Sequence, residues 1–297
     1  MNKLTEKPLP KRLALCLGLL LIYCFLNTLA VSAAPANTVK KIRVIDTDNL
    51  LNADSFNASD SAFPGIGFPP GANTLLLLNQ PNRQVSIILI SPAKGNKETQ
   101  SRKPLQISDP INIAFGAISK NEKDSGLSRL FLLDADFGEL ISIKSPSHQS
   151  RINRLNIQKF GITDPQGMTV DPETGRLFVL DVSASPRIIS IQPKPGREFA
   201  DAEVKQIVPE SLAGNLRGLA FNPEDGRLYI LSMAQQKLFA LTQDGKLVSS
   251  IAIQDQGTPQ GIIFAPSLDL SDHPSTFHLY LATVHGTNGK ITEWAVP

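Results

Sequence analysis

The sequence predicts an all-β fold, a single β-propeller built from four-stranded blades. A short motif recurs five times along the chain, and each copy is followed by a turn and then by an apolar run. In addition, one strand-like segment near the start has no repeat of its own, and the last repeat lacks one strand. Together these features indicate a ring of similar blades that closes on itself.

The opening motif sets the expected number of blades. Its copies are Phe63–Phe68, Pro110–Phe115, Pro165–Val170, Leu216–Phe221 and Pro259–Phe264. Their last residues, at positions 68, 115, 170, 221 and 264, are 47, 55, 51 and 43 residues apart, and each interval is about the length of one blade. We therefore expect five blades; six blades, with a degenerate one in residues 34–63, are the alternative.

Each repeat contains further strands after this motif. The turns at residues 171–176 and 222–227 are near copies, with Gly175 and Gly226 at positions where a positive φ costs little. The second strands are apolar at consecutive positions, which is typical of a sheet buried on both faces. They are Leu75–Leu78, Leu130–Leu133, Leu177–Leu180, Leu228–Leu231 and Leu279–Ala282. The third strands are Val85–Ile90, Leu140–Ile143, Ile188–Ile191, Lys237–Leu241 and Lys290–Val296.

The outer strands suggest how the ring closes. Four repeats have one, at Pro104–Ile107, Ile152–Ile157, Glu203–Val208 and Leu247–Ile253, and the polar run Lys94–Lys103 is expected to be a solvated loop. The fifth repeat has no outer strand, whereas Val39–Ile45 is a strand without a repeat. If Val39–Ile45 completes the last blade, the ring has no exposed edge. We therefore expect closure by an N-terminal strand.

The first 33 residues are expected to be a signal peptide. Basic residues precede an apolar run, and the small residues Val31 and Ala33 favour cleavage before Ala34. The expected domains are a signal peptide at residues 1–33 and one propeller at residues 34–297, in an exported protein of the periplasm or the extracellular space. An uncleaved membrane anchor is the alternative, because residues 13–31 are nearly long enough to span a bilayer.

Charge and cysteine content limit the function classes. Four of the 29 Lys and Arg residues and one of the 27 Asp and Glu residues lie in residues 1–33, so the remainder has a net charge near −1. The sequence therefore lacks the basic patch that is typical of nucleic-acid binding. Both cysteines, Cys16 and Cys24, belong to the signal segment, so the mature chain has no thiol for a disulfide, a metal site or a nucleophile.

Alternating strand direction predicts a ligand-binding face at one end of the ring. The loop before the first strand and the loop after the second strand lie at the same end. The first loop supplies the residues that we call the polar mouth: Asn112, Gln166, Arg217 and Gln260. The second loop supplies a polar residue in every repeat: Asn79, Asp134, Asp181, Ser232 and Thr283.

Two interpretations of this second set remain open. Its oxygens could hold Ca²⁺ or a polar ligand over the channel, with Asp134 and Asp181 as the candidate metal ligands. Alternatively, each side chain caps a turn by accepting hydrogen bonds from backbone N–H groups. In the polar mouth, Arg217 is the only charged residue, and its N–H donors favour an anionic or carbonyl-bearing ligand.

The remaining sequence features do not indicate a metal site, a catalytic nucleophile or a nucleotide-binding loop. The four histidines, His148, His273, His278 and His285, lack the spacing of metal ligands. His278 is expected at the surface, because it replaces an arginine that begins the same strand in other repeats. The sequence has no Gly-x-Ser-x-Gly elbow, phosphate loop or dinucleotide fingerprint.

One stretch also resembles a known repeat. Residues Gly167–Asp181, followed by Arg187–Ile191, resemble an NHL repeat, and residues 39–297 are similar to secreted bacterial NHL-like propellers. The resemblance implies membership of a superfamily that also includes gluconolactonase-type lactonases, strictosidine-synthase-like enzymes and metal-dependent esterases. Their metal-binding acidic and amide residues have no assignable counterpart here.

We therefore expect a binding module that contacts a polar small molecule, a polymer or an envelope protein through one polar face. A metal-assisted hydrolase or lactonase, or a related lyase, is the alternative. Its acidic residues would be Asp134 and Asp181, brought together only by folding. No catalytic residue is assigned, and Ca²⁺ is the one cofactor that the pattern suggests.

Overall fold

The structure of the chain is a computed structural model. It describes residues 39–46, 65–68, 75–79, 85–91, 96–105, 107–116, 129–144, 152–194, 198–209, 212, 215–253, 257–269, 271–285 and 288–297. The chain divides into two units, residues 1–36 and 37–297, and all described residues belong to the second. The segment expected to be a signal peptide lies outside the described residues, as do residues 47–64, which hold most of the proposed sixth blade.

The described strands form five antiparallel sheets of four strands each. The first contains β2 (Ile66–Gly67), β3 (Leu75–Asn79), β4 (Val85–Ser91) and β5 (Asn96–Leu105). The second contains β6 (Pro110–Gly116), β7 (Arg129–Asp134), β8 (Glu139–Lys144) and β9 (Ile152–Asn156). The third contains β10 (Pro165–Val170), β11 (Leu177–Asp181), β12 (Arg187–Lys194) and β13 (Glu198–Ile207). The fourth contains β14 (Leu216–Asn222), β15 (Arg227–Ser232), β16 (Lys237–Leu241) and β17 (Leu247–Ala252). The fifth contains β18 (Thr258–Pro266), β19 (Phe277–His285), β20 (Asn288–Ala295) and β1 (Lys40–Asp46).

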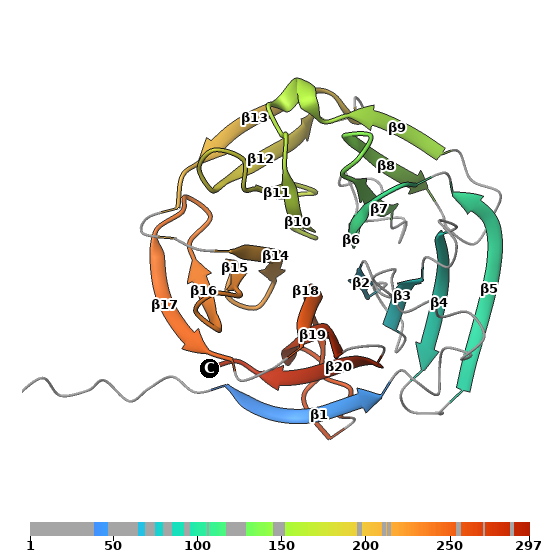
Figure 1. Cartoon of the computed structure of the whole chain (residues 1–297). Helices are drawn as coiled ribbons and strands as arrows, with labels where there is room; N and C mark the ends of the chain where they lie inside the picture. Colours follow the sequence, from blue (N-terminus) through green and yellow to red (C-terminus); the bar gives the residue numbers. More distant parts are fainter. Residues whose placement is uncertain are drawn as a thin grey trace, which may run out of the picture. The chain divides into compact units, whose positions relative to one another are not determined.

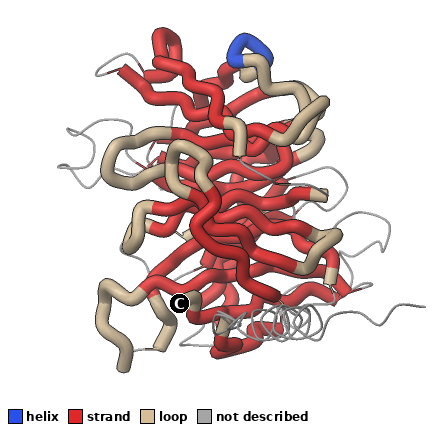
Figure 2. Tube along the Cα trace, turned by 90° about the vertical axis from the view of Figure 1, so that its left-hand side faces the viewer, coloured by secondary structure: helices blue, strands red, loops and turns tan. Residues whose placement is uncertain are grey.

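Within this unit the sheets surround a common axis (Figure 1). The innermost strands β2, β6, β10, β14 and β18 contact one another in that order, and β18 contacts β2. The view from the side shows that the described chain consists mainly of strands joined by loops and turns, with one short 3₁₀ turn among the described residues, Gln158–Phe160 (Figure 2). The predicted β-propeller with four-stranded blades is confirmed.

The closing strand comes from the other end of the chain, as expected. β1 pairs antiparallel with β20 from Lys40 opposite Ala295 to Asp46 opposite Lys290. The aliphatic side chains of Val39 and Ile45 pack on cores of the fifth blade. The edge that β20 would otherwise expose is therefore covered, which removes a site for unwanted strand pairing.

The hydrophobic core lies between neighbouring blades. One cluster joins Phe131 of β7 to Val179 of β11 and Ile189 of β12. Another joins Tyr229 of β15 to Leu281 of β19. Each second strand is buried on both faces because another sheet covers each side, which explains its consecutive apolar residues.

One expected loop is wrong. The polar run at residues 94–103 overlaps β5, Asn96–Leu105, which pairs with β4 as the outer strand of the first blade. An outermost strand is bonded to the sheet along one edge only, so its backbone pairing tolerates a sequence rich in polar residues. Among the described residues, no helix is long and apolar enough to cross a lipid bilayer.

Candidate functional site

Glycines bring the innermost strands together at the end of the ring where these strands begin, which we call the leading end. A Cβ atom placed on Gly167 of β10 would lie 2.5 Å from the backbone nitrogen of Leu219 in β14. A Cβ atom on Gly65 would lie 2.9 Å from the Cα of Asn112. Only glycine permits such approach, so the axial space is narrow at this level.

The polar mouth lies at the same end, where the innermost strands carry bulges. The register of β10 shifts between Pro165 and Gly167, and that of β18 shifts between Pro259 and Gly261. A bulge inserts one unpaired residue and changes the direction of its side chain. The inserted residues are Gln166 and Gln260, two of the four that the sequence placed at the mouth.

The side chains of the polar mouth are mostly engaged by the protein itself. Asn112 is buried, its Nδ2 donates to the Met168 carbonyl at 2.9 Å, and its Oδ1 accepts from the Ile113 N–H. Gln166 donates to the Asp164 carboxylate at 2.9 Å, and Gln260 donates to the carbonyl two residues before it. Asn112 therefore fastens β6 to β10, the innermost strand of the neighbouring blade.

Arg217 is half-buried, and its side chain has no hydrogen-bond or ion-pair partner among the described residues. Its positive charge affects the pKa of Asp109, which lies just before β6 at the same end. Desolvation, followed by the neighbouring carboxylates of Asp136 and Asp134, raises the pKa of Asp109, and the Arg217 charge acts in the opposite direction. The leading end thus brings the Arg217 guanidinium near the carboxylates of Asp109, Asp134 and Asp136.

The two candidate metal ligands of the sequence are committed to backbone donors. Asp134 is fully buried and accepts hydrogen bonds from the N–H groups of Ser108 at 2.9 Å and Asp109 at 3.1 Å. Asp181 accepts from the N–H groups of Asp164 at 2.7 Å and Thr163 at 3.3 Å. Each carboxylate holds the loop that precedes the innermost strand of its own blade.

Asp181 also forms an ion pair with Arg187, whose Nη2 lies 2.8 Å from Oδ2. Burial alone would raise the pKa of Asp181. The N–H of Asp164, the Arg187 guanidinium and the N–H of Thr163 more than offset this effect and lower the pKa below its ordinary value. Turn capping therefore accounts for Oδ1 of this carboxylate, whereas Oδ2 accepts from the side chains of Arg187 and Ser183.

Of the remaining members of this set, Asn79 and Ser232 end their strands, whereas Thr283 lies within β19. The Ser232 and Thr283 side chains are buried, and the Ser232 hydroxyl has no hydrogen-bond partner among the described residues. The side chain of Asn79 lies outside the described part of the structure. No group of three or more His, Cys, Asp or Glu residues in the described ranges is placed to hold a metal ion.

A cavity of about 480 Å³ opens at the opposite, trailing end, where the innermost strands finish. Its wall contains the last residue of the repeat motif from all five blades: Phe68, Phe115, Val170, Phe221 and Phe264. A second ring of prolines, two positions further along the chain, also lines it: Pro172, Pro223 and Pro266. Phe277 of β19 completes the aromatic part of the wall. We call this space the apolar cavity.

Two of the phenylalanines are supported from behind by other rings. Phe221 stacks on the buried Phe178, with ring centroids 6.2 Å apart. Phe264 packs against Tyr229, and the two ring centroids are 4.7 Å apart. These contacts fix ring positions before any ligand arrives, and pre-formed apolar walls are typical of ligand pockets.

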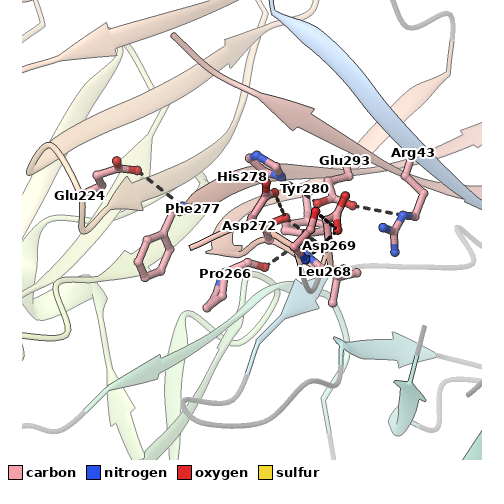
Figure 3. A network of polar contacts seen from close by, with 12 residues as sticks. Arg43, Glu224, Pro266, Leu268, Asp269, Asp272, Phe277, His278, Tyr280 and Glu293 are labelled. Atoms are coloured by element: carbon pink, nitrogen blue, oxygen red, sulfur yellow. Dashed lines mark hydrogen bonds and ion pairs between the residues drawn. The ribbon is translucent and has the colours of Figure 1, made fainter. Parts of the chain in front are cut away.

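A buried polar network lies beside the cavity, in the fifth blade (Figure 3). The Glu293 carboxylate is fully buried, with Oε1 2.8 Å from Nδ1 of His278 and 3.0 Å from the Tyr280 hydroxyl. Arg43 of β1 places Nε 3.5 Å from Glu293 Oε2. Burial and the nearby Glu293 carboxylate raise the pKa of Tyr280. The network joins the closing strand to the blade that it completes.

The expectation that His278 lies at the surface is wrong, because its side chain is buried against Glu293. Its repeat position matches that of the half-buried Arg176 and Arg227, but β20 places a buried carboxylate next to it. The apolar cavity was not predicted from the sequence. Its signal was the aromatic last column of the repeat alignment, which served there only to count blades.

Comparisons with known proteins show resemblance in fold alone. No protein-family model matches the chain, and no curated protein matches it in sequence. Solved structures resemble it over most of its length. One is a nidogen/laminin complex, with 17% identity, 74% of this chain and 71% of that chain covered, and a TM-score of 0.49.

Two further structures are similar to a comparable degree. A glucose dehydrogenase has 14% identity, 86% and 98% coverage of the two chains, and a TM-score of 0.48. A calcium-binding regucalcin from Agrobacterium tumefaciens has 12% identity, 81% and 94% coverage, and a TM-score of 0.47. Similarity at this level carries no information about the ligand or the activity of this chain.

Proposed function

We propose that this propeller is a binding module and that its ligand site is the apolar cavity at the trailing end. The observation that carries the proposal is the ring of five equivalent side chains, one from each blade, around a space of about 480 Å³. This volume lies within the range of small-molecule sites, which are mostly apolar with a few polar groups. The cavity is therefore suited to the apolar part of a small molecule or of a peptide.

The wall favours binding over bond-breaking chemistry. Its described side chains are aliphatic or aromatic, apart from Thr169 and Glu173. The Thr169 hydroxyl accepts a hydrogen bond from the Phe221 N–H at 3.0 Å, which ties β10 to β14. The ligand would thus gain affinity mainly from burial of apolar surface, at roughly 25 cal/mol per Å² before ordering costs.

The polar mouth remains a predicted contact surface for a polar molecule, polymer or envelope protein. Its amide side chains already bond to the protein, so a ligand there would have to compete with those bonds. The alternative function, a metal-assisted hydrolase or lactonase, requires carboxylates that are available to a cation. Asp134 and Asp181 are instead surrounded by N–H donors, so this alternative gains no support from them.

We place the module outside the cytosol on the strength of its sequence alone, with residues 1–33 as the exporting segment. The basic start, the apolar run and the small residues before Ala34 support this placement. A propeller that closes its own edge suits such a compartment, since it is stabilised by its core without disulfides.

A pair of alanine variants tests the proposed site. Ala114 lines the cavity on β6, whereas Ala252 is exposed on the outer strand β17. Ala114→Phe should fill part of the space and Ala252→Phe should not. Binding of the neutral fluorescent probe 1-N-phenylnaphthylamine would be titrated with both variants and the unmodified chain, after circular dichroism has confirmed folding.

We expect one probe molecule to bind per chain, and Ala114→Phe to weaken its binding at least tenfold, or about 1.4 kcal/mol. Ala252→Phe should leave the affinity unchanged. Equal affinity of both folded variants would place the probe elsewhere on the molecule and would refute the proposed site.

A further inference from the structure

Thr169 supplies the one side-chain hydroxyl group among the described residues that line the apolar cavity. It is half-buried and is the fifth residue of the repeat motif in β10. The equivalent residues of the other blades are apolar: Gly67, Ala114, Ala220 and Ile263. Two of them, Ala114 and Ile263, line the cavity together with Thr169. The wall therefore has a single hydroxyl group in a column of otherwise apolar residues.

The hydroxyl oxygen of Thr169 lies on the axial side of β14. It accepts a hydrogen bond from the Phe221 N–H at 3.0 Å. The N–H groups of a strand lie roughly in the plane of the sheet and point to one side of the strand or the other. Because β14 has a hydrogen-bonded neighbour, β15, on one side only, an N–H that bonds outside the sheet points toward the axis (Figure 1). The oxygen is therefore in the axial space, beside a residue that lines the cavity.

The hydrogen of this hydroxyl group has no acceptor within the described part of the chain. A threonine hydroxyl can donate one hydrogen bond and accept two. Its oxygen accepts from Phe221, but no described residue accepts a hydrogen bond from Thr169. The link between β10 and β14 therefore explains the oxygen, and the O–H donor is left for a molecule in the cavity.

The surroundings of this donor restrict the acceptor that it can meet. None of the described lining residues is Lys, Arg or His. A carboxylate or phosphate buried there would lose its hydration without gaining a cationic partner, which is costly. A neutral carbonyl oxygen is satisfied by a single donor, whereas a molecule without any acceptor would leave the hydroxyl group unpaired.

We propose that the apolar cavity prefers a neutral carbonyl compound, an apolar ketone, aldehyde or ester whose oxygen accepts a hydrogen bond from Thr169. This inference rests on the proposed function and adds the ligand class. The apolar part of the molecule gains affinity from burial, and the hydrogen bond selects among molecules of the same shape. Thr169 is thus a specificity-determining residue, and the Phe221 N–H fixes the position of its oxygen.

Two molecules of nearly the same shape separate the hydrogen bond from apolar burial. Acetophenone carries a carbonyl oxygen where α-methylstyrene carries a methylene group. Each would be titrated against bound 1-N-phenylnaphthylamine, with the unmodified chain and with Thr169→Val. The affinity ratio of acetophenone to α-methylstyrene should fall about three- to tenfold in Thr169→Val, which is the usual size of one hydrogen bond.

Two control variants locate the source of this change. Thr169→Ser keeps the hydroxyl group and should keep most of the ratio. Thr258→Val makes the same substitution at an exposed position, the first residue of β18, and should leave the ratio unchanged. Displacement with a ratio that Thr169→Val does not alter would overturn the inference and leave the proposed site standing. Failure of both molecules to displace the probe would contradict both.

Thr169→Val also removes the acceptor of the Phe221 N–H, so circular dichroism would first establish that the variant is folded. If it is not, infrared spectroscopy of acetophenone bound to the unmodified chain decides the question. A carbonyl group that accepts a hydrogen bond absorbs at a lower wavenumber than the same group in an alkane, and we expect this lowered band. A band at the alkane position would overturn the inference.

Discussion

The narrowing at the leading end can be tested by adding a single methyl group. Gly167→Ala places a Cβ atom 2.5 Å from the Leu219 nitrogen and 2.8 Å from the Gly218 carbonyl carbon. Both neighbours are backbone atoms of the adjacent blade, so no side-chain rotation can relieve the contact. Gly261→Ala makes the same change in the equivalent column, but its nearest contacts are 3.4 Å away, an ordinary van der Waals distance.

The expected difference follows from these distances. Overpacking of an interior costs about 1–3 kcal/mol, and the lower unfolded-state entropy of alanine returns about 0.4–1 kcal/mol. Gly167→Ala should therefore lower the free energy of unfolding by about 1–2 kcal/mol. Gly261→Ala should change it by less than about 1 kcal/mol, in either direction.

Urea denaturation at neutral pH measures both variants against the unmodified chain, with the slope m compared to confirm the same unfolding transition. In a thermal scan, Gly167→Ala should melt about 2–8 °C lower, at about 2–4 °C per kcal/mol for a domain near this size. Equal stability of the two variants would refute the account of the glycine column, because both sites would then have similar space.

Four further predictions concern the rest of the chain. The lowered pKa of Asp181 means that its contribution to stability is complete above about pH 4 and is lost as the pH falls through the folded value. Asp181→Asn should be less stable than the unmodified chain at pH 7, and its urea midpoint should fall less between pH 5 and pH 2. Arg217→Ala should raise the pKa of Asp109 further in an NMR titration, and should change the unfolding free energy by no more than about 0.5 kcal/mol. A chain that begins at Thr47 lacks β1 and should lose on the order of several kcal/mol, whereas one that begins at Asn37 should keep its melting temperature. Mass spectrometry of exported protein should find Ala34 at the N-terminus, and a full-length chain in the membrane fraction would favour the anchor instead.

The fold could be predicted because its determinants repeat. The turn at residues 171–175 recurs at residues 222–226, and in both the glycine adopts a positive φ of 68°. The apolar second strands and the lone strand at residues 39–45 then fixed the number of strands in each blade. Such local patterns survive in a single sequence because each blade must solve the same packing problem.

The site could be predicted only in part. Strand alternation placed the polar mouth at the leading end, and the bulges at Gln166 and Gln260 agree with that placement. The sequence does not show which end of the ring holds the cavity. It depends on distances between blades, such as that from Gly167 to Leu219, which no motif encodes.

The burial of two polar side chains, Glu293 and His278, was also not predicted from the sequence. Glu293 and His278 are separated by 15 positions in the chain and meet only because β19 pairs with β20. Neither residue has a local pattern that marks it as buried, and a buried carboxylate is stabilised only by partners that the fold brings to it. Reasoning by repeat position therefore placed His278 on the surface.

The most direct test of the apolar cavity as the ligand site is a crystal structure with the neutral apolar molecule 1-bromonaphthalene. The anomalous signal of bromine locates the molecule independently of its surroundings. We predict one bromine peak at the trailing end, within the wall that includes Phe115, Phe221 and Phe264. A peak beside Gln166 and Arg217 at the polar mouth, or crystals without any bound bromine at a saturating concentration, would contradict the account.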